Sequence, residues 1–231
     1  MIMIHIREIP RKLGMTYIMH LLQSGLDLLN LKLPKTTQED IIKYINLLDK
    51  WNKIHNLTAI RDPKAILIRH IFDSLAIVPF IIGPDILDFG TGAGLPGIPL
   101  ALALPEWNFV LLDSSNKKTT FLNHVVLSLN IKNVKVVTKR IEEFRFDRGF
   151  ATIVTRATTK TGIVIDKTVH LCAGSWQILV MKGKNPKDEL SDISKPFELH
   201  RIEVPYLDEE RHIAIISHSN RSSNVSVIKS S

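Results

Sequence analysis

The sequence predicts an α/β protein whose doubly wound, mostly parallel sheet follows a helical region. Three observations support this class. From residue 85 onward, short runs of Val, Ile and Leu alternate with helical segments, as in parallel sheets covered on both faces. The first of these runs ends in a glycine-rich turn that opens a helix. The first third of the chain has apolar residues at helical spacing instead, so we expect an N-terminal helical extension.

Residues 19–82 are expected to form this helical region, packed on the sheet domain. Thr36 and Glu39 have the spacing of a capping box. They precede apolar residues that share one helical face: Ile41, Ile45, Leu48 and Trp51. Asp62 followed by Pro63 is a second helix-start signal, an N-cap with proline at the first helical position. Up to Pro79, apolar residues again recur at helical spacing: Leu67, Ile71, Leu75 and Val78.

Residues 83–217 are expected to form the α/β domain. Its strands are predicted at 86–89, 108–113, 135–137, 151–155, 178–181, 199–204 and 212–217. Amphipathic or apolar helices are predicted at 97–104 and 117–129, between the early strands. The last two strands are close together in the sequence and could form an antiparallel edge of the sheet.

Composition and the two ends of the chain limit its class further. With 231 residues, of which 45% are hydrophobic, the chain is long enough for one well-filled core. Residues 1–18 and 218–231 are expected to be disordered extensions. No apolar run approaches the roughly 20 residues that span a bilayer, so no membrane association is expected. The single cysteine, Cys172, fits a reducing cytoplasm.

The central functional signal is the segment 88–97, with the sequence DFGTGAGLPG. Its glycines let the backbone turn with positive φ and let a ligand approach without a Cβ in the way. Asp113 stands at the end of the next strand, where a carboxylate can accept hydrogen bonds from both hydroxyls of an adenosine ribose. Taken alone, the segment also satisfies the dinucleotide-binding fingerprint G-x-G-x-x-G.

Two features of this segment favour a methyl donor over a dinucleotide. Asp88 precedes the first glycine, where it can face the amino acid portion of the donor or order the loop. Pro96 and Pro99 remove amide N–H groups near the helix start, and a pyrophosphate site depends on those amides. A structural turn without a ligand remains a third interpretation.

No pattern in the sequence points to covalent catalysis or to a metal site. The nine histidines form no H-x-x-x-H pair, and neither a nucleophile elbow nor a P-loop occurs. Methyl transfer from a sulfonium to a ring nitrogen with a free lone pair needs alignment more than side-chain chemistry. We therefore expect no general base. Arg156 follows the strand at 151–155 and is the best candidate for orienting the reactants, because ligands bind at the carboxyl ends of parallel strands.

Several short motifs follow one another along residues 19–217. They are Trp51-Asn52-Lys53, Asn56-Leu57-Thr58, Arg61-Asp62-Pro63, Arg69-His70, Asp73-Ser74, the run Asp88–Pro99, Leu111-Leu112-Asp113-Ser114, Arg140-Ile141-Glu142-Glu143-Phe144, Thr155-Arg156-Ala157, Met181-Lys182-Gly183 and Glu210-Arg211-His212. In these motifs and in their order, the chain resembles the small-subunit rRNA guanine-N7 methyltransferases, a family also called RsmG or GidB.

The resemblance implies a class I (Rossmann-like) methyltransferase fold with a seven-stranded sheet. It implies transfer of a methyl group from S-adenosylmethionine to N7 of a guanine in the 530 loop of 16S rRNA. From the resemblance, the donor is expected to contact Gly90, Leu95, Ile141, Glu142 and Arg156. From the chemistry of the loop and of the next strand end, Asp88, Gly92 and Asp113 are also expected at the donor site.

The expected partner is 16S rRNA, within the small ribosomal subunit or an assembly intermediate, and the protein is expected to be a monomer. The formal net charge of +7 favours an anionic partner but is spread along the chain. The cations expected to contact RNA are Arg61, Arg69, Lys117, Lys118 and Lys182. Arg69 also precedes Asp73 at helical spacing, which predicts a local ion pair.

The sequence departs from the family's pattern at two places. Thr158 stands where the family usually has an aromatic residue, two positions after the arginine, and Ser115-Asn116 replaces the usual Leu-Gly. Two other functions stay open at this point. An NAD(P)-dependent oxidoreductase is disfavoured by Asp88 and Pro96, and a non-catalytic RNA-binding assembly factor is disfavoured by the intact loop with Asp113.

Overall fold

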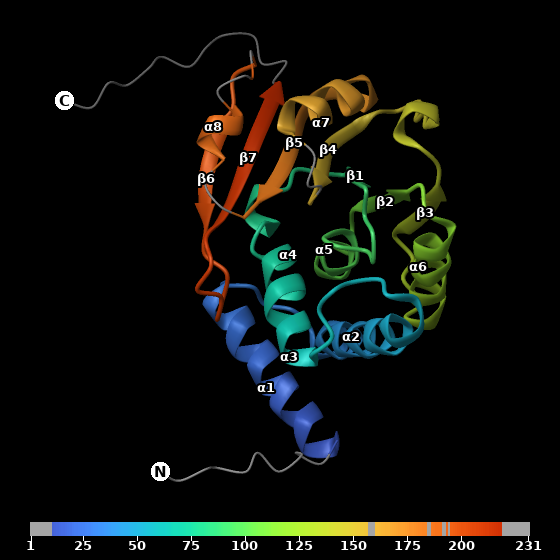
Figure 1. Cartoon of the computed structure of the whole chain (residues 1–231), viewed down its shortest axis with the longest axis vertical. Helices are drawn as coiled ribbons and strands as arrows, with labels where there is room; N and C mark the ends of the chain where they lie inside the picture. The colour runs from blue at the N-terminus through green and yellow to red at the C-terminus, as the bar shows by residue number, and fades with distance from the viewer. Residues whose placement is uncertain (1–10, 157–159, 184–185, 191–192, 194, 219–231) are drawn as a thin grey trace, which may run out of the picture.

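One sheet of seven strands organises the protein (Figure 1). The computed structural model describes residues 11–156, 160–183, 186–190, 193 and 195–218. The strands are β1 (Asp85–Phe89), β2 (Asn108–Asp113), β3 (Val134–Thr138), β4 (Phe150–Thr155), β5 (Cys172–Lys182), β6 (Glu198–Ile202) and β7 (Arg211–His218). Their order across the sheet is β3-β2-β1-β4-β5-β7-β6, which confirms the predicted α/β class.

Strands β1 to β5 are parallel, and β7 lies antiparallel between β5 and β6. The predicted antiparallel edge is therefore present. The chain runs outward from β1 through β2 to β3 and then returns to β4 on the other side of β1. This reversal is a topological switch point, and ligands of open α/β sheets bind outside the carboxyl ends of the strands at such a point.

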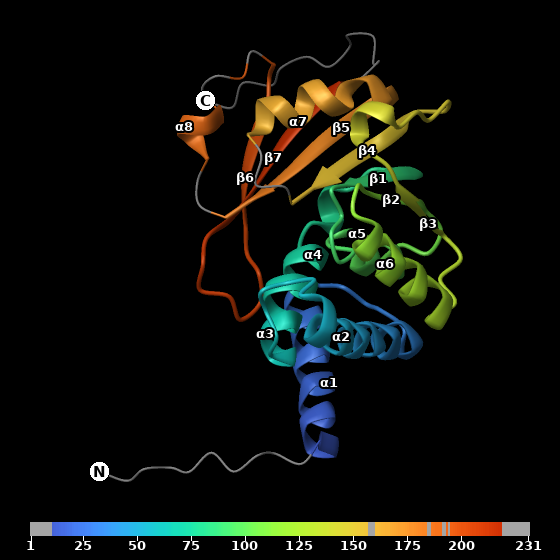
Figure 2. The same cartoon turned by 45° about the vertical axis from the view of Figure 1, so that its right-hand side comes forward.

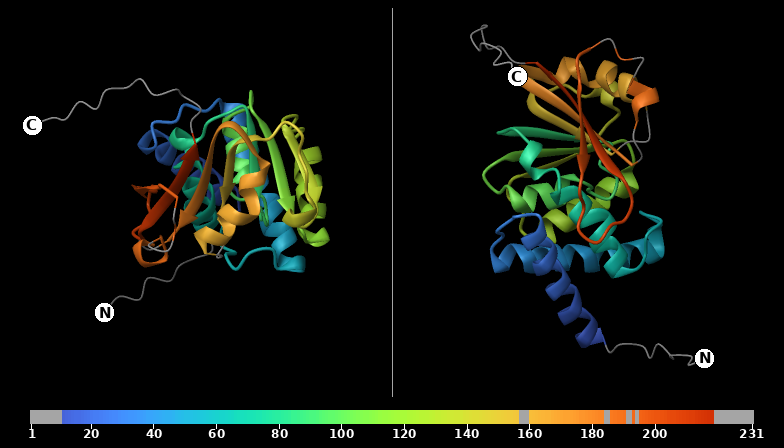
Figure 3. Two further views of the ribbon diagram at one scale, coloured as in Figure 1. Left: turned by 90° about the horizontal axis from the view of Figure 1, so that it is seen from above. Right: turned by 90° about the vertical axis from the view of Figure 1, so that its left-hand side faces the viewer.

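Helices cover both faces of the sheet (Figure 2). On one face lie α1 (Arg11–Leu28), α2 (Lys35–His55), α3 (Pro63–Ile66), a π-helical segment (Leu67–Phe72), α4 (Asp73–Leu75), a 3-10 turn (Val78–Phe80), α5 (Gly97–Ala103) and α6 (Asn116–Ser128). The other face carries α7 (Thr161–Thr168), flanked by 3-10 turns at Ile141–Glu143 and Val169–Leu171, and α8 (Lys187–Leu190) packs beside α7. Figure 3 shows the same two layers from above and from the side.

Successive residues of the central strands pack into two separate hydrophobic cores, one on each face of the sheet. On β1, Ile86 belongs to the core beneath the N-terminal helices and Leu87 to the core beneath α7. On β2, Leu111 and Leu112 divide in the same way. Side chains of a strand alternate between faces, so a strand covered on both sides has a continuous apolar run. This explains why the strands could be located as unbroken runs of Val, Ile and Leu.

The helical region differs from expectation at its start. Helix α1 begins at Arg11, so part of the stretch 1–18 that was expected to be disordered is helical. Ile18, Leu22 and Leu26 are buried at a spacing of four residues, so they form one apolar helical face that begins within this stretch. Residues 1–10 and 219–231, which include nearly all of the expected C-terminal tail, lie outside the described residues. Within the described part, no helix is long and apolar enough to cross a membrane.

The two helix-start signals have different outcomes. Asp62 caps α3 as predicted, since its Oδ2 accepts a hydrogen bond of 2.8 Å from the N–H of Ala65. The capping box at Thr36 is not formed. Helix α2 begins two residues earlier than this motif predicts, because the carbonyl of Pro34 already accepts the first helical hydrogen bond, from the N–H of Gln38, and α2 has no side-chain cap.

Candidate active site

The glycine-rich loop after β1 is built around the side chain of Asp88. This carboxylate is fully buried, and its Oδ2 accepts hydrogen bonds from Thr91 Oγ1 (2.6 Å) and from the N–H of Gly97 (2.7 Å). A Cβ at position 97 would lie 2.2 Å from the Leu111 side chain, so only glycine fits there. Of the two roles expected for Asp88, the geometry supports ordering of the loop.

Burial also raises the pKa of Asp88, to about 7. Its second oxygen, Oδ1, is buried and has no hydrogen-bond partner among the described residues. A buried carboxylate oxygen without a donor is costly, and the cost is relieved by protonation or by a nearby positive charge.

Neighbouring strands and helix α2 hold the loop from three sides. The N–H groups of Gly90 and Thr91 both donate to the carbonyl of Leu112 at the end of β2, at 2.9 and 3.2 Å. Thr155 Oγ1, at the end of β4, donates to the carbonyl of Phe89 at 2.7 Å. The hydroxyl of Tyr44, a fully buried residue of α2, donates to the carbonyl of Ala93 at 2.7 Å. The loop conformation is therefore fixed by the protein itself.

A cavity of about 320 Å³ opens beside this loop at the carboxyl ends of β1, β2 and β3. It brings together four of the residues expected to contact the donor: Gly90, Asp113, Ile141 and Glu142. Gly90 has φ +67°, and a Cβ built on it would meet no atom within 4 Å, so its α-carbon faces open space. Leu95, expected at the same site, is instead buried in the core beneath the loop.

Asp113 has two functions in this geometry. Its Oδ2 accepts a hydrogen bond of 2.9 Å from the N–H of Gly92, and its Oδ1 accepts one of 2.9 Å from the N–H of Ser115. It thereby fixes the loop as well as lining the cavity. A carboxylate has about four lone-pair sites, and Oδ2 uses a second one to accept from Lys118 Nζ, so Oδ1 is the oxygen that can accept a further bond from a ligand hydroxyl. Lys118, expected at the RNA, forms an ion pair with Asp113 at 3.3 Å and lines this cavity.

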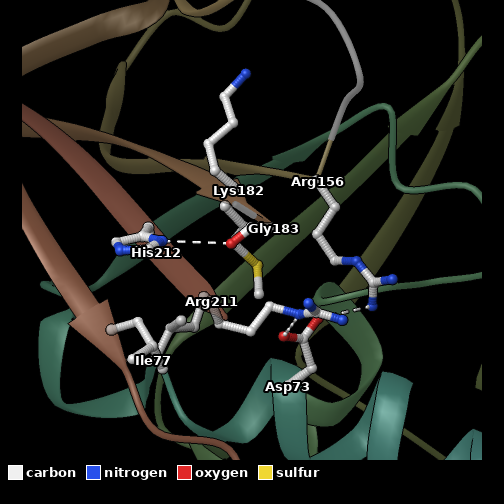
Figure 4. A pocket seen from close by; sticks show the side chains of 9 residues that line it. Asp73, Ile77, Arg156, Lys182, Gly183, Arg211 and His212 are labelled. Carbon is white, nitrogen blue, oxygen red and sulfur yellow. Dashed lines mark hydrogen bonds and ion pairs between the residues drawn. The ribbon is translucent and has the colours of Figure 1, made fainter. Parts of the chain in front are cut away.

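Arg156 lies in a second cavity, of about 220 Å³, at the carboxyl ends of β4 and β5 (Figure 4). Its guanidinium faces Asp73 from α4, with Nη1 3.5 Å from Oδ2. Arg211 from β7 holds the other carboxylate oxygen, with Nε 3.1 Å from Oδ1. The predicted local pair between Arg69 and Asp73 is wrong. Arg69 pairs with Glu209 instead, because the loop before β7 brings that residue beside the helix.

The other cations expected to contact RNA differ in their surroundings. Lys182 lies at the end of β5, where it pairs with Glu189 at 2.8 Å and its side chain is only 10% exposed. Arg61 and Lys117 have uncharged partners: Arg61 donates to the Asn56 side chain and Lys117 to the carbonyl of His55. The charges of Arg61 and Lys117 are therefore not neutralised by these contacts.

The loop after α2, residues 56–62, is shaped by Asn52. This buried side chain accepts from the N–H of Thr58 (2.9 Å) and donates to the carbonyl of Ile60 (3.1 Å). Thr58 Oγ1 then lies 3.0 Å from Nε2 of His70, which stands next to Arg156. The motif residues of the helical region thus connect this loop to the cavity around Arg156.

Tyr44, Glu189 and the pairing of Asp73 with Arg211 have structural roles that were not predicted. Glu189 accepts hydrogen bonds from the N–H and the hydroxyl of Thr161, at the start of α7, besides its pair with Lys182. Asp73 and Arg211 stand in the quoted motifs, but nothing in local spacing indicates that residues 138 positions apart make contact. Thr158, which replaces the family's aromatic residue, lies outside the described residues. Within the described ranges, no three His, Cys, Asp or Glu side chains gather as a metal site would require.

Comparison with known sequences gives one consistent result. A family model described as "GidB: rRNA small subunit methyltransferase G" matches residues 37–214. A protein of Legionella pneumophila (strain Corby) named "Ribosomal RNA small subunit methyltransferase G" is 43% identical over 209 residues, which are 90% of this chain and 99% of the relative. A protein of the same name from Hahella chejuensis is 44% identical over 201 residues, covering 86% of this chain and 93% of its own.

Solved structures support the fold independently. An O-methyltransferase from Bacillus cereus, in complex with SAH, superposes with a TM-score of 0.56 at 17% identity, covering 88% of this chain and 100% of its own. A SAM-dependent methyltransferase from Aquifex aeolicus superposes with a TM-score of 0.53 at 16% identity, covering 72% of this chain and 97% of its own. At such low identity these structures establish a shared fold alone.

Proposed function

The chain belongs to the rRNA small subunit methyltransferase G family, and from this membership we propose that it methylates N7 of a guanine in the 530 loop of 16S rRNA. The resemblance seen in the sequence motifs is confirmed, and with it an enzyme that transfers methyl groups from S-adenosylmethionine to 16S rRNA. The observation that supports the proposal best is the cavity formed by Gly90, Asp113, Ile141 and Glu142 beside a fixed glycine loop.

The order of the strands suggests how the donor lies. Across the sheet, Ile141 lies after β3, Asp113 ends β2, the glycine loop follows β1 and Arg156 follows β4. An extended donor with its adenine near Ile141 and its ribose at Asp113 would place its sulfonium at the loop. Its amino acid end would then reach the side of β4, where Arg156 can receive the carboxylate. Leu95 would support the loop from below without touching the donor.

The residues present fit such a donor. Gly90 leaves open space where a side chain would otherwise fill the cavity. The buried Asp88 Oδ1 lacks a partner, which suits a ligand that carries positive charge nearby. Arg156 Nη1 is buried and also lacks a hydrogen-bond acceptor among the described residues, which suits a ligand carboxylate.

When bound, S-adenosylmethionine supplies an electrophilic methyl group and a neutral leaving group. The protein's part is to align the reactants, because guanine N7 has a free lone pair and loses no proton. Asp113 would hold the ribose and Arg156 the amino acid end. His70, beside Arg156, has its pKa lowered to about 4 by burial and by Arg156, so it stays neutral at physiological pH and adds no charge to the site.

The chemical step should therefore be nearly independent of pH. In single-turnover experiments with saturating donor, we expect a flat rate from about pH 6 to 9, without the limbs that a general base or acid produces. Asp88 titrates in this range, but it is enclosed and bonded to Thr91 and Gly97, so it cannot take a proton from RNA.

Asp88 should affect donor affinity instead. Its pKa is raised from 3.8 to about 7, so it is mostly protonated below pH 7 and ionised above it. The ionised form should attract the cationic donor more strongly, and donor affinity should rise as pH rises through 7. If the single-turnover rate still rises with pH when the donor is saturating, the prediction that the chemical step needs no general base is wrong.

RNA binding should depend on cations that are not neutralised within the protein. Lys117→Ala should flatten the slope of log affinity against log salt by about 0.7 to 0.9, the contribution of one neutralised phosphate. Lys43→Ala is the matched control, because Lys43 is an exposed lysine already paired with Asp40 at 2.8 Å. Filter-binding titrations over a range of salt would measure both slopes, and equal slopes for the two variants would exclude Lys117 from the RNA interface.

We further propose that the protein acts as a cytoplasmic monomer on the small subunit or an assembly intermediate. Two of the cations expected to contact RNA, Lys118 and Lys182, are already paired with carboxylates, so naked RNA should bind weakly at physiological salt. The folded 530-loop region would then have to present the guanine.

Transfer of labelled methyl groups from S-adenosylmethionine to purified small subunits tests this function. Label in 16S rRNA is the expected result. A thermal shift with NAD but not with S-adenosylhomocysteine would favour an oxidoreductase instead, since only bound ligands stabilise the folded state. If the protein binds the donor but transfers no methyl group to subunits or to assembly intermediates, a role as an assembly factor would be favoured.

A further inference from the structure

We propose that Asp73, fixed by Arg211, is a positioning residue that aims Arg156 at the amino acid end of the methyl donor. The inference rests on the proposed function, since it assigns Arg156 to the donor carboxylate. Asp73 is only 5% exposed, and each of its carboxylate oxygens faces one arginine (Figure 4).

The helix that carries Asp73 is irregular in a way that serves this contact. A π-helical segment, Leu67–Phe72, precedes it, and the N–H of Asp73 donates to the carbonyl of His70. The hydroxyl of Ser74 donates to the same carbonyl at 2.6 Å. π-Helical turns are rare and occur often at functional sites, because they change which side chains share a face. Here His70 and Asp73 both come to lie against Arg156.

His70 restricts Arg156 without binding it. Its Nδ1 lies 3.0 Å from the carbonyl of Arg69, which can only accept, so Nδ1 carries the proton. The same nitrogen therefore cannot accept a hydrogen bond from Arg156 Nη2, 3.4 Å away. Its other nitrogen accepts from Thr58. Arg156 thus contacts a neutral ring on one side and the Asp73 carboxylate on the other.

Arg211 is a fixed support for Asp73. Besides its bond to Asp73, it donates through Nη1 to the carbonyl of Glu210 (2.9 Å) and through Nη2 to Glu209 (3.2 Å). All three parts of its guanidinium are engaged, which leaves it little freedom to bind a ligand. Arg156 differs, because its buried Nη1 has no acceptor with hydrogen-bond geometry among the described residues.

The charge balance favours an anionic ligand at Arg156. Arg69, Arg156 and Arg211 form one network with two carboxylates, Asp73 and Glu209, which leaves one positive charge in excess. Glu209 lies on the exposed side, next to Arg69 and Arg211. The excess is therefore available at Arg156, where a ligand carboxylate would complete the hydrogen bonds.

The test compares two ligands that differ only at the amino acid end. S-adenosylhomocysteine carries the carboxylate, whereas 5′-methylthioadenosine has the same adenosine and sulfur without it. In calorimetric titrations, Asp73→Asn should weaken S-adenosylhomocysteine binding about tenfold, the effect of one charged hydrogen bond. Binding of 5′-methylthioadenosine should not change. Asp40→Asn, which breaks an exposed ion pair on α2, is the matched control and should leave both affinities unchanged.

Arg156→Ala should show the same selective loss, and combining it with Asp73→Asn should add little, because the two residues act as a unit. If Asp73→Asn does not fold, Arg211→Gln replaces it in the titrations, because Arg211 lies nearer the surface. It should also weaken only S-adenosylhomocysteine. Equal weakening of both ligands, or unchanged S-adenosylhomocysteine binding, would overturn the positioning role. Wild-type protein that binds neither ligand would overturn the proposed function itself.

Discussion

Gly90→Val should abolish binding of the methyl donor while leaving a folded protein. The substitution places a branched side chain in the open space beside the glycine loop, where the donor must lie close to the backbone. We expect the affinity for S-adenosylhomocysteine to fall at least about 100-fold, since the cavity cannot hold both groups and the interior packs without spare volume. Calorimetric titration measures the affinity, and circular dichroism reports the fold.

Part of any effect at position 90 comes from the backbone, because a non-glycine residue at φ +67° is strained by about 1–2 kcal/mol. Gly174→Val is the matched control. Gly174 has the same φ of +67° and also has nothing within 4 Å of a built Cβ, but it lies in β5 away from the cavity. Gly174→Val should lose a similar amount of stability and keep its donor affinity. Normal donor binding by Gly90→Val would place the donor elsewhere.

Asp113→Ala should weaken donor binding by about 1–3 kcal/mol, or about 5- to 150-fold, the range for lost hydrogen bonds to a charged group. The loss has two sources. The carboxylate would no longer bind the ribose hydroxyls, and the N–H groups of Gly92 and Ser115 would lose their acceptors. The same titration with S-adenosylhomocysteine gives the number.

A carboxylate at the opposite end of the sheet separates this effect from a general loss of stability. Asp85 begins β1 and forms a long ion pair with Arg148 at 3.4 Å. Asp85→Ala should leave donor affinity unchanged. If Asp113→Ala binds the donor as tightly as Asp85→Ala does, Asp113 does not contact the donor.

Local patterns were sufficient for most of the fold. The strands were located because burial on both faces requires continuous apolar runs, and Asp62 was identified because a cap acts within one helical turn. The capping box at Thr36 failed for an equally local reason. The carbonyl of Pro34 starts the helical hydrogen bonds two residues earlier than the motif implies.

The candidate site was also predictable only in part, where local motifs determine it. Gly90 and Asp113 could be identified because a tight turn and a strand end have chemical requirements that short motifs express. The partner of Asp73 could not be identified from the sequence. Arg211 is 138 residues further along the chain, and it contacts Asp73 only because β7 pairs with β5. Likewise, Lys182 was predicted to contact RNA, but its charge is paired with Glu189. Ion pairs that the tertiary fold brings together decide which charges remain free, and helical spacing carries no information about them.

The position of the transferred methyl group tests the central claim most directly. Small subunits from a strain lacking this protein would be incubated with the purified enzyme and S-adenosylmethionine, and the 16S rRNA would be digested and analysed by mass spectrometry. We expect one added methyl group on a guanine within the 530-loop fragment, assigned to N7 by fragmentation of the nucleoside. A methyl group on another base or on another atom of that guanine, or fragments without any added methyl, would contradict it.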